Sequence, residues 1–141
     1  MMIHNLEEYC NISKVVSDKE YRNNLGIKVK KVKDLYMLNY DKLRLTKDNI
    51  GSLGLFRSVI TNGKDIVCFS PPKSHSILDI VNEKYDELCI EEFVEGTMIN
   101  LFYHNNWECT TKSVVGARCK FFKDNKKKFR TLFLEAMGDL E

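Results

Sequence analysis

The stretch from Gly54 to Ser70, GLFRSVITNGKDIVCFS, decides the fold expected for this chain. Two strand-like runs, residues 54–60 and 65–70, flank a turn centred on Asn62 and Gly63. Asn-Gly is the preferred pair for a type I′ hairpin turn, because both central residues of that turn take a positive φ. The stretch therefore predicts an antiparallel hairpin over residues 54–70 with no helix inside it.

Strand-like runs continue beyond this hairpin. Pro71 and Pro72 end its second run, because proline donates no hydrogen bond to a strand ladder. Three further runs then form a predicted meander, at residues 87–94, 97–104 and 107–113. The middle run is apolar on both faces, which is typical of a central strand covered from both sides. We therefore expect Leu101, Phe102 and Trp107 to be buried.

A lysine-rich run precedes the hairpin. Residues 26–33, GIKVKKVK, partly alternate apolar residues with lysines, which predicts a strand with one basic face exposed to water. A second apolar run, LYMLNY at residues 35–40, follows it. Two interpretations of the lysines at positions 28, 30, 31 and 33 stay open. They either bind phosphate or protect a solvated edge strand from aggregation.

Helices are expected at both ends of the chain. Ser17 and Glu20 have the spacing of a capping box, which predicts a helix that begins at Ser17. Apolar residues recur at helical spacing near the C-terminal end, so a second helix is expected to begin near Phe129. With no internal repeat and no linker, residues 1–141 are expected to form a single α+β domain that is rich in antiparallel sheet and flanked by helices.

The composition narrows the classes of protein that fit. The 141 residues are 43% hydrophobic and 30% charged, which excludes a disordered or collagen-like chain. Twenty-two basic and 20 acidic residues leave a net charge of +2, so bulk charge does not mark a nucleic-acid binder. The first residues are unlike a signal peptide, and no apolar run approaches the roughly 18 residues of a membrane helix. We therefore expect a cytoplasmic, reducing location and no membrane partner.

The cysteines and histidines carry no recognisable site. The chain has five cysteines, an odd number, and no Cys-x-x-Cys pair. They are therefore expected to be core thiols and not zinc ligands or disulfide partners. The three histidines, at positions 4, 75 and 104, lack metal-ligand spacing, and the sequence therefore predicts no metal site. Neither the phosphate loop Gly-x-x-x-x-Gly-Lys-Ser/Thr nor Gly-x-Gly-x-x-Gly is present.

Polar residues at the expected strand ends are the remaining candidates for chemistry. They are Arg57, Lys73, Glu95, Gly96 and Lys112. Three cations can bind the oxygens of a triphosphate, and a carboxylate can bind a ribose hydroxyl. Ordinary solvated side chains are the other interpretation of the same residues.

The order of these residues resembles the adenylation domain of phage-type RNA ligases, within the covalent nucleotidyltransferases, as in ligase-like proteins of large DNA viruses. The first half of the match is LFRSVITNGKDIVCFSPPKS, with Arg57 and Lys73 at the matching places. The second half is EEFVEGTMINLFYHNNWECTTKSVVGA, with Glu95, Gly96 and Lys112. The resemblance covers about residues 54–137. It implies part of a nucleotidyltransferase core, ATP and Mg²⁺ as cofactors, and a nucleotide or an RNA 5′ end as partner.

Two departures from that family concern catalysis. The nucleophilic lysine of the family falls on Phe93, in Phe-Val-Glu-Gly where the family has Lys-x-Asp-Gly, and a phenyl ring cannot form a phosphoramidate. The family's later acidic strand and Lys-x-Lys strand have no counterpart in the sequence. The resemblance therefore implies an RNA ligase-like domain without autonomous catalysis. Such a domain is either a pseudoenzyme, or a part of a pocket that a partner chain or a missing C-terminal segment completes. Lys73 is the candidate for a relocated nucleophile, and a non-catalytic RNA-binding or assembly module that reuses the fold is the alternative function.

Overall fold

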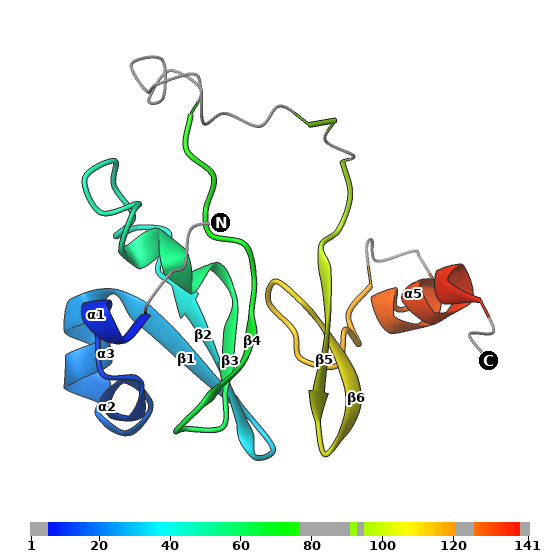
Figure 1. Ribbon diagram of the computed structural model, residues 1–141, viewed down its shortest axis with the longest axis horizontal. Helices are drawn as coiled ribbons and strands as arrows, with labels where there is room; N and C mark the ends of the chain where they lie inside the picture. The colour runs from blue at the N-terminus through cyan, green and yellow to red at the C-terminus, as the bar shows by residue number, and fades with distance from the viewer. Residues whose placement is uncertain (1–5, 77–90, 93–94, 121–125, 139–141) are drawn as a thin grey trace.

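The computed structural model describes residues 6–76, 91–92, 95–120 and 126–138 (Figure 1). Its elements are the helices α1 (Leu6–Tyr9), α2 (Ile12–Ser17), α3 (Lys19–Leu25) and α5 (Phe129–Met137), the 3-10 helix η1 (Leu53–Arg57), and the strands β1 (Ile27–Val32), β2 (Leu35–Tyr40), β3 (Val59–Thr61), β4 (Ile66–Phe69), β5 (Ile99–His104) and β6 (Asn106–Thr111). Strands β1 to β4 form one sheet in sequence order, and β5 and β6 form a second. All the strand pairs are antiparallel, so the expected α+β class with antiparallel sheet is confirmed.

The four-stranded sheet lies between two layers, with the N-terminal helices on one face and the β5–β6 hairpin on the other (Figure 1). On the helix side, Leu38 of β2 and Val59 of β3 pack with Phe56 of η1, and all three are fully buried. On the hairpin side, Phe102 of β5 packs against Leu35, Met37 and Ile60 of the sheet. Alternation along β2 divides its side chains between these two cores, because successive residues of a strand point to opposite faces.

The β1–β2 hairpin confirms the strands predicted from the lysine-rich run. Its strands pair from Ile27 opposite Tyr40 to Val32 opposite Leu35, and a two-residue turn joins them. Ile27 and Val29 face the helices, whereas Lys28 is exposed on the opposite face. The first four residues of β1 therefore give it one apolar and one basic face. Lys31 breaks this pattern, because alternation places it on the helix side with Ile27 and Val29.

The helix predicted from Ser17 begins at Lys19, and its cap lies one residue after Ser17, so that assignment of the cap is wrong. Asp18 is the residue that caps α3, because its carboxylate accepts a hydrogen bond from the Tyr21 backbone N–H at 3.0 Å. Ser17 is the last residue of α2, and its hydroxyl donates to the Ser13 carbonyl at 2.9 Å. Asn11 caps α2 in the same way as Asp18 caps α3.

The hairpin predicted over residues 54–70 is confirmed only in part. Strands β3 and β4 pair antiparallel, but residues 53–57 form the 3-10 helix η1 where a strand was expected. Leu53, Leu55 and Phe56 are all buried in the helix-side core, and an extended strand would turn alternate side chains away from it. Burial of all three apolar side chains on one side therefore accounts for the helical turn.

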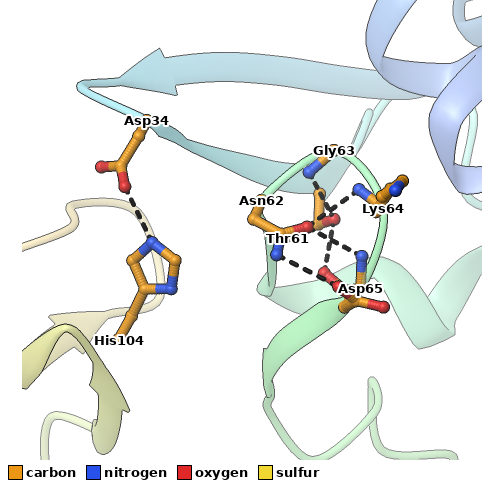
Figure 2. Close-up of polar contacts among 7 residues, drawn as sticks. All are labelled: Asp34, Thr61, Asn62, Gly63, Lys64, Asp65 and His104. Atoms are coloured by element: carbon orange, nitrogen blue, oxygen red, sulfur yellow. Dashed lines mark hydrogen bonds and ion pairs between the residues drawn. The ribbon is translucent and has the colours of Figure 1, made fainter.

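The turn of this hairpin is longer than the predicted two-residue type I′ turn. Residues 62–65 separate the paired residues Thr61 and Ile66, and only Gly63 among them has a positive φ, +99°. The Asn62 side-chain oxygen accepts the backbone N–H groups of Lys64 and Asp65 at 2.9 and 2.8 Å (Figure 2). Asparagine therefore acts here through its side chain and not through a left-handed backbone.

The prediction of a central strand at residues 97–104 is wrong. Among the described strands, β5 pairs only with β6, and one of its faces is open to solvent. Phe102 is 5% exposed as expected, but Leu101 is 47% exposed and Trp107 is 65% exposed. Of the strand expected over residues 87–94, Glu91 and Glu92 lie in no strand, and the rest lies outside the described residues.

The C-terminal helix α5 begins at Phe129, as predicted. It lies beyond the β5–β6 hairpin, on the side away from the four-stranded sheet (Figure 1). The backbone N–H of Phe129 donates to the Cys119 carbonyl at 2.9 Å, and Arg130 forms an ion pair with Glu108 of β6. None of the helices in the described part of the chain has the length and apolar character needed to cross a membrane.

The cysteines agree in part with the expectation of core thiols. Cys10 and Cys109 are buried, whereas Cys68 and Cys119 are half-buried. These four are free thiols, and Cys89 lies outside the described residues. Burial raises the pKa of the Cys10 thiol to about 11, so it stays protonated at neutral pH.

Candidate anion-binding site

A pocket of about 490 Å³ lies at the open end of the β1–β2 hairpin, where β2 and η1 meet the segment that follows β6. Four cationic side chains line it, those of Lys28, Lys42, Arg57 and Lys112. Asp41 is the one acidic residue of its wall. The wall therefore carries three net positive charges, which favours an anionic ligand.

Asn39 holds two of these cationic residues in place. Its side-chain amide donates to the backbone carbonyl of Arg57 at 2.7 Å and to that of Lys112 at 3.0 Å. Asn39 lies on the same face of β2 as Leu35 and Met37, so its amide points toward the β5–β6 layer. One side chain of β2 thereby joins η1 to the end of β6 and brings Arg57 and Lys112 to one pocket.

Tyr40 positions the amine of Lys112. The Lys112 Nζ donates to the Tyr40 hydroxyl at 3.3 Å and lies 5.1 Å from the centre of its ring. The tyrosine is buried, so its ring is a fixed surface under the ammonium group. The positive charge is therefore held at the pocket wall.

Arg57 has a hydrogen-bond donor without an acceptor. Its Nε is buried and has no partner among the described residues, although its backbone carbonyl is bonded to Asn39. A buried donor left without an acceptor costs about 1–3 kcal/mol. The planar guanidinium matches the oxygens of a phosphate or carboxylate, so Arg57 is a donor suited to an anion in the pocket.

The carboxylate of Asp41 is already engaged. Lys28 Nζ lies 2.9 Å from its Oδ1, and the Leu43 backbone N–H donates to the same oxygen at 3.1 Å. The hydrogen bond from Lys28, helped by that from Leu43, lowers the pKa of Asp41. Because Asp41 stays ionised and paired, it does not offset the charges of Arg57 and Lys112.

The structure brings together two of the five residues expected at a site. Arg57 and Lys112 share the pocket, whereas Lys73, Glu95 and Gly96 are not among its wall residues. Lys73 lies beside η1, where its backbone N–H donates to the Gly54 carbonyl at 2.9 Å. Its Nζ donates to the carbonyl and the hydroxyl of Ser74, at 2.9 and 3.3 Å.

Glu95 and Gly96 are both exposed in the segment before β5. Phe93, which takes the place of the family's nucleophile in the resemblance, lies outside the described residues. The carboxylate expected to bind a ribose hydroxyl is therefore not in the pocket of Arg57 and Lys112.

Sequence reasoning missed Asn39, Tyr40 and Lys42. Asn39 had a recognisable signal, because it follows Leu35 and Met37 at alternate positions and is thus a polar residue on an apolar face of a strand. Tyr40 and Lys42 had none, since nothing local distinguishes them from an ordinary core tyrosine and a solvated lysine.

The residues of the pocket fit the phosphates of ATP better than they fit Mg²⁺. Arg57 and Lys112 supply charged donors, but Asp41 is paired with Lys28. No group of three or more His, Cys, Asp or Glu side chains in the described part of the chain is arranged to hold a metal ion. Comparisons with protein-family models, with curated proteins and with solved structures found no match for this chain.

Proposed function

We propose that this chain is an RNA ligase-like domain that binds the phosphate group of a nucleotide or of an RNA 5′ end, reversibly and without covalent catalysis. The observation that carries the proposal is the convergence of Arg57 and Lys112 on one cationic pocket. The resemblance to phage-type RNA ligases suggests the class of ligand, and the pocket suggests where its phosphate binds.

Phosphate binding accounts for the particular arrangement of the pocket. Arg57 and Lys112 each contribute a charged donor to the pocket wall. Charge-assisted hydrogen bonds of this kind are about twice as strong as neutral ones. Because Tyr40 already positions the amine of Lys112, little entropy of that side chain is lost when a ligand binds.

Reversible binding follows from the residues that would have to act as nucleophiles. The resemblance places Phe93 at the position of the nucleophilic lysine, and phenylalanine has no nucleophilic atom. Lys73, the alternative nucleophile, directs its amine to Ser74 and is not a wall residue of the pocket. We therefore assign the chain a binding role and no covalent step.

Calorimetric titration with ATP and with a 5′-phosphorylated RNA tests the binding role. We expect Arg57→Gln to weaken binding of either ligand by about 10- to 100-fold, the equivalent of one charged hydrogen bond of 1.5–3 kcal/mol. Lys112→Gln should weaken it in the same direction. Lys31→Gln is the matched control, because Lys31 is exposed and lies 5.5 Å from the Tyr36 ring on the helix side of the sheet. Equal affinity of the wild type and Arg57→Gln would refute the proposal.

Incubation with radiolabelled ATP or GTP and Mg²⁺ tests the absence of covalent chemistry. We expect no label to stay on the denatured protein. An acid-labile, alkali-stable adduct that maps to Lys73 would instead identify an enzyme with a relocated nucleophile.

A further inference from the structure

We propose that the exposed face of β1 is a track for the backbone of a single-stranded nucleic acid, which runs from the pocket of Arg57 and Lys112 to a second pocket at the turn of the β1–β2 hairpin. This inference rests on the proposed function, because it extends the ligand of the first pocket from one phosphate to a chain of phosphates. It also gives a role to Lys30 of β1.

The second pocket, of about 310 Å³, lies between the β1–β2 turn, the β5–β6 turn and residues 115–118. Its two carboxylates are engaged. His104 Nε2 lies 2.8 Å from Asp34 Oδ2 (Figure 2), and Glu108 forms an ion pair with Arg130. Its two cations, Lys33 and Arg118, make no hydrogen bond or ion pair with any described residue. With Arg130 counted beside Glu108, three cations face two carboxylates, so the net charge around this pocket is +1, weaker than in the first pocket.

Strand β1 joins the two pockets. Lys28 lines the first pocket and Val32 lines the second, and alternation places Lys30 between them on the same face. Two residues along a strand advance about 6.6 Å, close to the separation of successive phosphates in an extended single strand. The six residues of β1 span about 20 Å, so the two pockets and Lys30 offer cations at intervals that suit such a strand.

Protection of an edge strand does not explain this arrangement. Strand β1 is at the edge of its sheet, and exposed lysines alone would discourage its pairing with another chain. That purpose needs no cationic pocket at either end of the strand. The placement of Arg57 and Lys112 beyond one end, and of Arg118 beyond the other, points to a ligand longer than one nucleotide.

A single strand fits this surface better than a duplex. The two pockets have the volume of small-ligand sites, large enough for one nucleotide each and too small for a double helix. Leu43 is 93% exposed at the first pocket and offers an apolar surface to a base. At the second pocket, the amides of Asn105 and Asn106 can hydrogen-bond to base edges. Single-strand binding typically combines such contacts with a cationic path for the backbone.

Fluorescence anisotropy with 5′-phosphorylated, 3′-labelled oligouridylates tests the track. We expect a ten-nucleotide ligand to bind the full chain at least tenfold more tightly than a dinucleotide. Lys30→Gln and Arg118→Gln should weaken binding of the ten-nucleotide ligand and leave the affinity for ATP unchanged. Each should also reduce the slope of log affinity against log salt by about 0.7, the value for one phosphate contact with a single strand.

The neighbouring Lys31→Gln is the control, because it removes the same charge from the same strand on the opposite face. Equal effects of Lys30→Gln and Lys31→Gln, equal affinity for short and long ligands, or equal affinity for a duplex would each overturn the track. If ATP binding also proves insensitive to Arg57→Gln, the proposed function has failed along with it. If ATP binding needs Arg57 but length has no effect, only the track has failed. Circular dichroism shows whether each variant is folded.

Discussion

Replacement of Phe102 by alanine tests how the β5–β6 hairpin is attached to the rest of the molecule. Phe102 is 5% exposed and packs against Leu35, Met37 and Ile60 on the four-stranded sheet. A buried phenylalanine replaced by alanine typically costs about 3–5 kcal/mol of the free energy of unfolding. The two-stranded hairpin can settle over part of the space left behind, so we expect a loss near the lower end, about 3 kcal/mol. For a chain of this length, that corresponds to a fall in Tm of about 10 °C.

Urea and thermal denaturation followed by circular dichroism measure this loss. Leu101→Ala is the matched control, because Leu101 is the adjacent residue of β5 and is 47% exposed on the opposite face. We expect the control to lose less than about 1 kcal/mol. If both variants lost the same free energy, or if Phe102→Ala melted like the wild type, the assignment of the packed face of β5 would be wrong.

Three further predictions concern the backbone, a thiol and a hydrogen-bonded carboxylate. Gly26→Ala should lower the free energy of unfolding by about 1–2 kcal/mol in urea titrations, because Gly26 ends α3 at φ +74° and a Cβ there would lie 3.3 Å from the Arg44 side chain. In the native protein at pH 8, iodoacetamide should modify Cys10 far more slowly than the half-buried Cys119, as peptide mass spectrometry can show, because burial raises the Cys10 pKa to about 11; equal rates would contradict this. The hydrogen bond from His104 lowers the pKa of Asp34, so its contribution to stability is present above the ordinary carboxyl pKa and is lost as the pH falls through the lower native value. The difference in stability between the wild type and Asp34→Asn, measured by urea titration, should therefore shrink below about pH 4, and a difference that stayed constant would count against the hydrogen bond between His104 and Asp34.

Much of the local structure was predictable because it depends on neighbours in the sequence. Alternating apolar residues and lysines specify β1, and apolar residues at helical spacing specify α5. Asn62 and Gly63 locate the β3–β4 turn, although the turn has four residues and not two. Errors arose where distant residues decide the outcome. Phe56 and its neighbours form a helical turn because the helix-side core takes their side chains, which local periodicity does not reveal.

The candidate site depends more heavily on the tertiary structure. Arg57 and Lys112 were recognisable as polar residues at strand ends, but their encounter in one pocket depends on the two hydrogen bonds from Asn39. Lys73, Glu95 and Gly96 were equally plausible in the sequence and lie outside that pocket wall.

The sequence by itself determined the α+β class, a strand with one basic face, and the place of the β3–β4 turn. These features depend on periodicity and on turn residues, which act over a few positions. Only the tertiary structure decided which face of β5 is buried and which cations share a pocket. Both outcomes depend on how the β5–β6 hairpin docks on the four-stranded sheet. Phe102 of the hairpin packs against the sheet, and Asn39 of the sheet donates a hydrogen bond to the Lys112 carbonyl after β6. Such docking is a long-range contact between segments far apart in the chain, and no local pattern in either segment encodes it.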